Sequence, residues 1–135
     1  MFGVFDGHGG CEVARFVEIH LVDELKKNES FKKGNYRQAL IDVFLLIDKM
    51  LLSDPAKKEL TKISQKHGAM ASGQTIDGGE LAYQAGCTCC VAIITKQEVY
   101  VANAGDTRCV IATKGAAKDL SVDHKPDLPA EKRRV

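Results

Sequence analysis

Residues 87–115, "CTCCVAIITKQEVYVANAGDTRCVIATKG", decide the fold class of this 135-residue chain. The stretch is dense in β-branched residues and is interrupted by short turn-like segments, which is the pattern of consecutive strands. We therefore predict three antiparallel strands at about 88–95, 98–103 and 108–113. Lys96-Gln97 and residues 104–107 are expected to form the turns between them.

Two amphipathic helices are expected before these strands. Apolar side chains recur at helical spacing at residues 10–27, and again from about 36 to 52. These positions are Val13, Phe16, Val17, Leu21 and Leu25, followed by Leu40, Val43, Phe44, Ile47 and Leu51. We also predict a short buried strand at 2–5 and a final helix that begins near Pro129. Helices grouped before strands indicate an α+β fold and not alternating β-α-β units.

The segment at about 53–86 is predicted to be a loop or an insertion. Its second half, "GAMASGQTIDGGELAYQAG" at 68–86, is rich in glycine and small polar residues, which favours irregular structure. Its first half, "AKKELTKISQKHG" at 56–68, is also compatible with a short helix. Both interpretations stay open for that half.

Composition excludes several classes of protein. The net charge is +1 with no basic face, which argues against a nucleic-acid binder. No apolar run approaches the ~20 residues that a membrane-spanning helix needs. The number of cysteines, five, is odd, which does not favour a framework of disulfides. Three of them, Cys87, Cys89 and Cys90, lie close together, but no second pair of Cys or His residues follows at the spacing of a zinc site. We expect reduced, buried thiols, and hence a cytoplasmic or nuclear protein.

Residues 2–10, "FGVFDGHGG", carry the candidate chemistry. A carboxylate at a strand end, here Asp6, can bind or bridge hard divalent cations. Gly7 has no side chain, so its carbonyl group can approach an ion closely. A histidine at this place, His8, has a side chain of the kind that can give a proton to a leaving group. The combination indicates metal-assisted hydrolysis, and the structural alternative is an Asp-Gly turn before a helix, with His8 as a cap or a solvated residue.

Three motifs in order resemble one known family. "VFDGHGG" at 4–10 resembles a signature of the metal-dependent protein serine/threonine phosphatases of type 2C. "GCTCCVAIITKQEVYVANAGDTRCVI" at 86–111 and "LSVDHKPDLPAEKRRV" at 120–135 look like two further signatures of that family. By this resemblance, residues 1–135 form a partial type 2C phosphatase catalytic domain.

The resemblance implies a fold, a reaction and a set of site residues. The fold is an antiparallel β-sandwich flanked by helix pairs, in four layers α-β-β-α, here incomplete. The reaction is hydrolysis of phosphoserine and phosphothreonine in a phosphoprotein substrate, with two Mg²⁺ or Mn²⁺ ions and a third ion in some members. Asp6 would bridge the metals, Gly7 would offer its carbonyl, and His8 would be the general acid. Asp106 would help to hold the third ion, or would be a turn acid that bonds its own backbone.

Departures from the family pattern limit this interpretation. Family members are longer and have an upstream phosphate-binding arginine and further metal-binding acids on both sides. We therefore expect an internal piece of a phosphatase domain, inactive when isolated. The alternative is a non-catalytic truncated phosphatase or pseudophosphatase that acts as a binding module. Residues 123–126, "DHKP", are expected to form a structural loop tied near the site.

Overall fold

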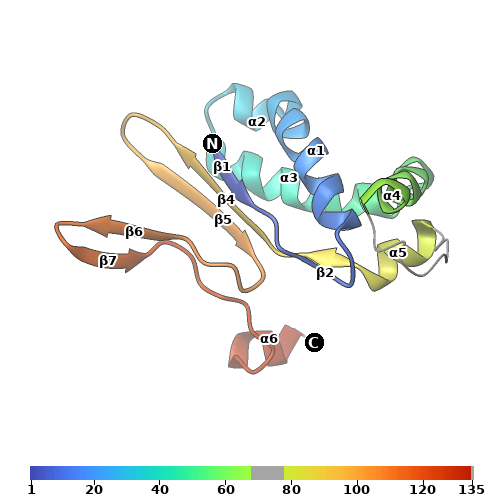
Figure 1. Cartoon of the computed structure of the whole chain (residues 1–135). Coiled ribbons are helices and arrows are strands. Elements are labelled where there is room, and N and C mark those ends of the chain that lie inside the picture. Colours follow the sequence, from blue (N-terminus) through green and yellow to red (C-terminus); the bar gives the residue numbers. More distant parts are fainter. Residues whose placement is uncertain (68–77, 135) are drawn as a thin grey trace. The chain divides into compact units, whose positions relative to one another are not determined.

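The computed structural model describes residues 1–67 and 78–134, and the chain divides into two compact units (Figure 1). Unit 1 consists of Met1–Asp6 and Thr88–Val135, and unit 2 consists of Gly7–Cys87. The chain therefore passes from unit 1 to unit 2 directly after Asp6, and returns directly after Cys87. Residues 2–10 contribute to both units.

Unit 1 is built on a three-stranded antiparallel sheet with the strand order β1-β4-β5. The strands are β1 (Phe2–Val4), β4 (Cys89–Ile94) and β5 (Val99–Ala104). In the central strand, Val91 pairs with Gly3 on one side and with Ala102 on the other. Thr95 closes the β4–β5 turn, because its N–H donates to the Glu98 carbonyl at 2.9 Å and its hydroxyl accepts from the Glu98 N–H. The first two strands predicted in the 87–115 stretch are confirmed.

The two faces of this sheet differ in exposure. Val91 and Ile93, on one face of β4, are 0% and 6% exposed. Side chains alternate along a strand, so Phe2, Val4 and Ile94 lie on the opposite face, where they are 69%, 58% and 56% exposed. The prediction that 2–5 is a buried strand is therefore wrong, since β1 is an edge strand whose two large side chains stand on the open face.

The third predicted strand forms a separate hairpin. β6 (Val110–Thr113) pairs with β7 (Ala116–Asp119), and not with β5. Lys114 and Gly115 both have positive φ, 50° and 79°, as two-residue hairpin turns require. The sequence did not predict β7, because "AAKD" has no β-branched residue. α6 (Pro129–Arg134) begins at the predicted proline.

Unit 2 contains five helices and one short strand pair among its described residues. The helices are α1 (Glu12–Lys27), α2 (Glu29–Lys32), α3 (Tyr36–Leu51), α4 (Asp54–His67) and α5 (Gly78–Gln84). The strands β2 (Gly7–His8) and β3 (Gly86–Cys87) pair antiparallel. α1 packs on α3 and α4, and its apolar stripe is buried, with Phe16 and Leu21 each 1% exposed. Both predicted amphipathic helices are confirmed.

Local hydrogen bonds explain where these helices begin and how they are joined. Asn28 caps α2 by accepting from the Phe31 N–H at 3.0 Å, so a single helical turn forms in a segment that reads as a polar loop. His20 of α1 lies 2.9 Å from a Glu59 oxygen of α4, which links the two helices.

The structure corrects the expectation for residues 53–86. A loop is wrong for 54–67 and 78–84, which form α4 and α5. In α4 the buried Ala56, Leu60 and Ile63 fall on one face, so packing selects the helix that the composition left open. Residues 68–77 lie outside the described part, and the insertion stays a prediction.

Helices and antiparallel sheets together confirm the α+β class. Each sheet in the described part of the chain is antiparallel. Among the helices of residues 1–67 and 78–134, none is long and apolar enough to cross a membrane.

Candidate functional site

Asp6, the first predicted site residue, directly follows β1 in unit 1. Its backbone carbonyl accepts a hydrogen bond from the Thr88 N–H at 2.8 Å, which fixes the chain where the strand ends. The Asp6 side chain is exposed and makes no hydrogen bond or ion pair with any other described residue. Its carboxylate is therefore available to a cation.

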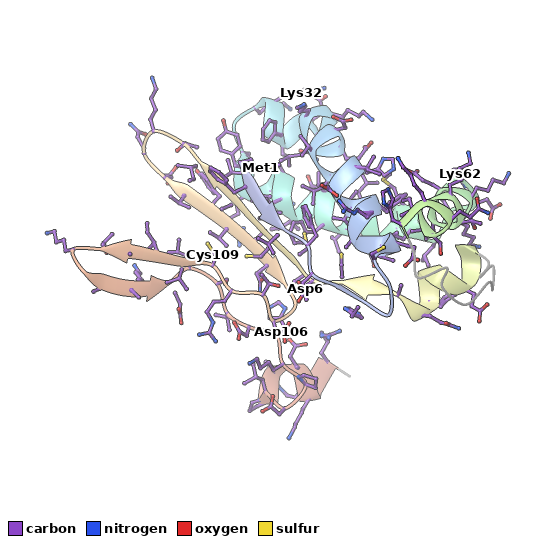
Figure 2. All side chains as sticks on the ribbon, in the orientation of Figure 1. Met1, Asp6, Lys32, Lys62, Asp106 and Cys109 are labelled. Carbon is purple, nitrogen blue, oxygen red and sulfur yellow. The ribbon has the colours of Figure 1, made fainter. Side chains whose placement is uncertain are left out.

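Thr88 connects Asp6 to the second predicted acid, Asp106. Its hydroxyl lies 2.6 Å from the hydroxyl of Thr107, and a Cβ on Gly105 would lie only 2.7 Å from the Thr88 Cβ. The three residues thus hold the turn after β5 against the chain segment that begins β4. Asp6 and Asp106 lie at the same end of the three-stranded sheet (Figure 2).

The turn at 105–108, called the Asp106 turn below, is held by side-chain hydrogen bonds. The amide of Asn103 donates to the carbonyls of Gly105, at 2.9 Å, and Val122, at 3.0 Å. The N–H of His124 also donates to the Gly105 carbonyl at 2.9 Å. Asp106 itself is exposed and bonds no described residue, so it does not cap its own turn.

An ion pair ties residues 123–126 to this turn, which confirms the expected structural role of "DHKP". The guanidinium of Arg108 donates two hydrogen bonds to Asp123, at 2.9 and 2.8 Å. The hydrogen bonds and the positive charge of Arg108 hold the pKa of the Asp123 carboxyl below its usual range. This carboxylate is occupied, which distinguishes it from the free Asp6 and Asp106.

The other two predicted site residues, Gly7 and His8, form β2 in unit 2. They stand opposite Cys87 and Gly86 of β3, respectively. A Cβ on Gly7 would lie 2.9 Å from the carbonyl oxygen of Gly10 and 3.2 Å from the Ala14 Cβ. Only glycine fits this position without displacing backbone, and the fit brings the strand close to the start of α1.

Residues 7–10, called the glycine loop below, pack so closely against their surroundings that a Cβ has no room at the three glycines. Gly9 has φ +68°, and a Cβ there would overlap the carbonyl oxygen of Gln84. Gly10 has φ +147°, and a Cβ there would overlap the carboxylate of Glu12. Glu12 is 4% exposed, and its Oε2 has no hydrogen-bond partner among the described residues. The glycines are therefore needed for close approach, and His8 lies between two of them.

The donor set agrees with a hard divalent cation but is incomplete. Carboxylate and carbonyl oxygens, as on Asp6, Gly7 and Asp106, are the ligands that Mg²⁺ and Mn²⁺ prefer. Within residues 1–67 and 78–134, no three His, Cys, Asp or Glu side chains converge on a point where a metal could lie. Residues 1–67 and 78–134 thus offer suitable donors in too small a number for an enclosed two-ion site.

The cysteines of the described residues do not gather with other His, Cys, Asp or Glu side chains around one point. All five are free thiols, and Cys89 and Cys90 are buried. Burial raises the pKa of the Cys87 thiol to about 11, so this sulfur stays protonated near neutral pH.

The whole chain matches one family of known proteins. The family model described as Protein phosphatase 2C covers residues 1–135. The chain belongs to the protein phosphatase 2C family. It is 49% identical over 135 residues to Protein phosphatase 2C 1 of Paramecium tetraurelia, a match that covers 100% of this chain and 41% of that relative. It is 44% identical over 134 residues to Protein phosphatase 2C homolog 2 of Hypocrea jecorina, covering 99% of this chain and 25% of that protein.

This chain therefore spans about two fifths of the length of the Paramecium phosphatase 2C relatives that it matches. Sequence reasoning missed three positions that shape the predicted phosphatase site, namely Gly86, Thr88 and Asn103. All three lie inside the quoted 86–111 motif. The sequence offered one partial signal, since a glycine beside a strand indicates that another group approaches closely but does not say which group.

Proposed function

We propose that this chain contributes part of the catalytic centre of a metal-dependent phosphatase that hydrolyses phosphoserine and phosphothreonine in proteins. The observation that carries the proposal is the placement of two free carboxylates, Asp6 and Asp106, at one end of the sheet, linked through Thr88. Membership of the protein phosphatase 2C family supports the same reaction.

Each site residue has a defined task in this proposal. The Asp6 carboxylate and the Gly7 carbonyl would hold Mg²⁺ or Mn²⁺, and Asp106 would help to hold a further ion. When bound, two such ions would lower the pKa of a water molecule and neutralise charge on the phosphoryl group. His8, exposed on β2, would give the proton of its imidazole to the serine or threonine oxygen as that oxygen leaves.

An isolated chain of this composition is expected to be a poor catalyst. Affinity for hard cations rises with the number and charge of the ligands, and among the described residues two free carboxylates are linked at the sheet end. The exposed side chains of Phe2, Val4 and Ile94 also leave an apolar sheet face open to water. The reduced thiols are in keeping with a cytoplasmic or nuclear setting, which we include in the proposal.

The test uses two proteins. The first is the 135-residue chain alone, and the second, called the flanked protein below, has residues 1–135 in place of the matching segment of Paramecium Protein phosphatase 2C 1. We expect the flanked protein to release phosphate from a phosphothreonine peptide only when Mn²⁺ or Mg²⁺ is present. The chain alone should bind Mn²⁺ weakly in a calorimetric titration and should release little phosphate.

Two results would contradict the proposal. Metal-dependent turnover by the 135-residue chain alone would show that the donor set is not incomplete. A folded flanked protein without metal-dependent activity would favour the alternative, a non-catalytic binding module.

A further inference from the structure

Gly86 and His8 stand directly opposite each other in the antiparallel pair β2–β3, within unit 2. Side chains at directly opposite positions of two strands lie on the same face and contact each other. Gly86 has no side chain, and the tip of the His8 imidazole lies in the space that a side chain at 86 would take. A Cβ on Gly86 would lie 2.6 Å from Nε2 and 2.9 Å from Cε1 of His8.

These distances are well below the usual separation of about 3.5–4.0 Å between nonbonded carbon atoms. The His8 ring therefore fits over β3 only because residue 86 is glycine. Gly86 does not have a left-handed φ, so residues other than glycine could adopt its backbone conformation. The close approach of His8 is the steric reason that the structure shows for a glycine at this position.

We propose that Gly86 is a positioning residue for His8, because the missing side chain at 86 sets where the imidazole lies. The inference rests on the proposed function, in which His8 protonates the leaving oxygen. His8 is exposed, so a methyl group at 86 would displace the ring toward solvent and leave the backbone in place. The fold should tolerate the change, while the imidazole should lose its position.

The first experiment reads the ring position directly and needs no activity. In the 135-residue chain, NOE spectra at a single pH should connect the His8 ring protons to the α protons of Gly86. Gly86→Ala should move the His8 ring resonances and leave those of the other three histidines, His20, His67 and His124, unchanged. The unfolding midpoint of the variant in urea should stay within error of the parent.

Gly3→Ala is the matched control. Gly3 is also a strand glycine without a left-handed φ, and a Cβ there would meet only the end of the Phe5 ring, at 2.9 Å. We expect it to leave the His8 resonances unchanged. Absence of the His8–Gly86 NOE, or His8 resonances that stay in place in Gly86→Ala, would overturn the inference.

The second experiment reads the consequence for catalysis in the flanked protein. Gly86→Ala should lower kcat/KM on a phosphothreonine peptide by roughly tenfold or more, because small misplacements of a catalytic group are costly. On an aryl phosphate with a good leaving group the loss should stay within about twofold, since that group needs no proton. In a His8→Ala background, Gly86→Ala should cause no further loss on the peptide.

The two experiments separate the possible failures. If the NOE is present but His8→Ala keeps full activity on the peptide, then His8 is not the general acid, and the proposed role of His8 fails. If His8→Ala is impaired on the peptide and Gly86→Ala is not, then the positioning inference alone is overturned. Equal losses on both substrates in Gly86→Ala would indicate general structural damage and would also overturn it.

Discussion

The glycine loop of unit 2 and the Asp106 turn of unit 1 are held by different means. The loop contains close backbone packing, in which Gly7 and Gly9 leave no room for a side chain. The turn is held by side-chain hydrogen bonds, above all from Asn103. A single added methyl group should therefore damage the loop, whereas the turn should lose stability gradually as its bonds are removed one at a time.

The largest loss of stability is expected in the glycine loop, from the substitution Gly9→Ala. The substitution combines a left-handed φ of +68° with overlap of the new Cβ and the Gln84 carbonyl. Strain and steric overlap together should lower the free energy of unfolding by about 2–4 kcal/mol, measured by urea denaturation of the 135-residue chain.

Gly34→Ala is the control for that loss. Gly34 has a similar φ of +77°, but nothing lies within 4 Å of a Cβ there. Gly34→Ala should lower the free energy of unfolding by only about 1 kcal/mol, because backbone strain is its sole effect. Equal losses in the two variants would mean that close packing adds nothing to the glycine loop.

An intermediate loss of stability is expected in the Asp106 turn, from the substitution Asn103→Ala. This change removes two hydrogen bonds, to the carbonyls of Gly105 and Val122. The expected loss is about 1–2 kcal/mol in the same urea assay, because part of the bonding to these carbonyls is replaced by water. Gln97→Ala, in the exposed β4–β5 turn, should change stability by less than about 0.5 kcal/mol. A loss in Asn103→Ala as large as in Gly9→Ala would remove the distinction between the two regions.

The smallest effect is expected for the ion pair beside the turn. Arg108 depresses the pKa of Asp123 below its usual value of 3.8 in the folded state. The pair therefore stabilises the fold fully above that value, and this contribution is lost as the pH falls through the lower, folded-state pKa. In the parent, the urea midpoint of unfolding should fall between pH 6 and pH 2, and this fall should be smaller in Asp123→Asn. Asp106 makes no ion pair with a described residue, so Asp106→Asn serves as the control and should show the same fall as the parent. An unchanged drop in Asp123→Asn would show that the pair adds no measurable stability.

The sequence predicts most of the local structure because periodicity is a local signal. The stripes that include Phe16 and Leu21 in α1, and Val43 in α3, identify those helices without any knowledge of packing. Pairing is not local, so the sequence placed β6 next to β5 although it pairs with β7. The exposure of Phe2 has the same origin, because burial depends on what covers a strand and not on the strand's own residues.

The candidate site divides in the same way. Asp6, Gly7 and His8 are contiguous in the sequence and could be named from the chemistry of their side chains. Gly86 and Thr88 act through contacts with residues about 80 positions away, His8 and Asp6, and no property of their own identifies those contacts. Their roles became visible only when the register of β2–β3 and the Thr88–Asp6 hydrogen bond were known.

The most direct test of the account compares the two free acids in the flanked protein. Phosphate release from a phosphothreonine peptide is measured across a series of Mn²⁺ concentrations for the parent, Asp6→Asn and Asp106→Asn. We predict that Asp6→Asn lowers kcat/KM by at least about a hundredfold at every Mn²⁺ concentration, because a neutral amide cannot bridge two cations equally well. Asp106→Asn should retain more activity and should need more Mn²⁺ to reach it. Full activity in a folded Asp6→Asn protein would contradict the assignment of Asp6 to the metal centre.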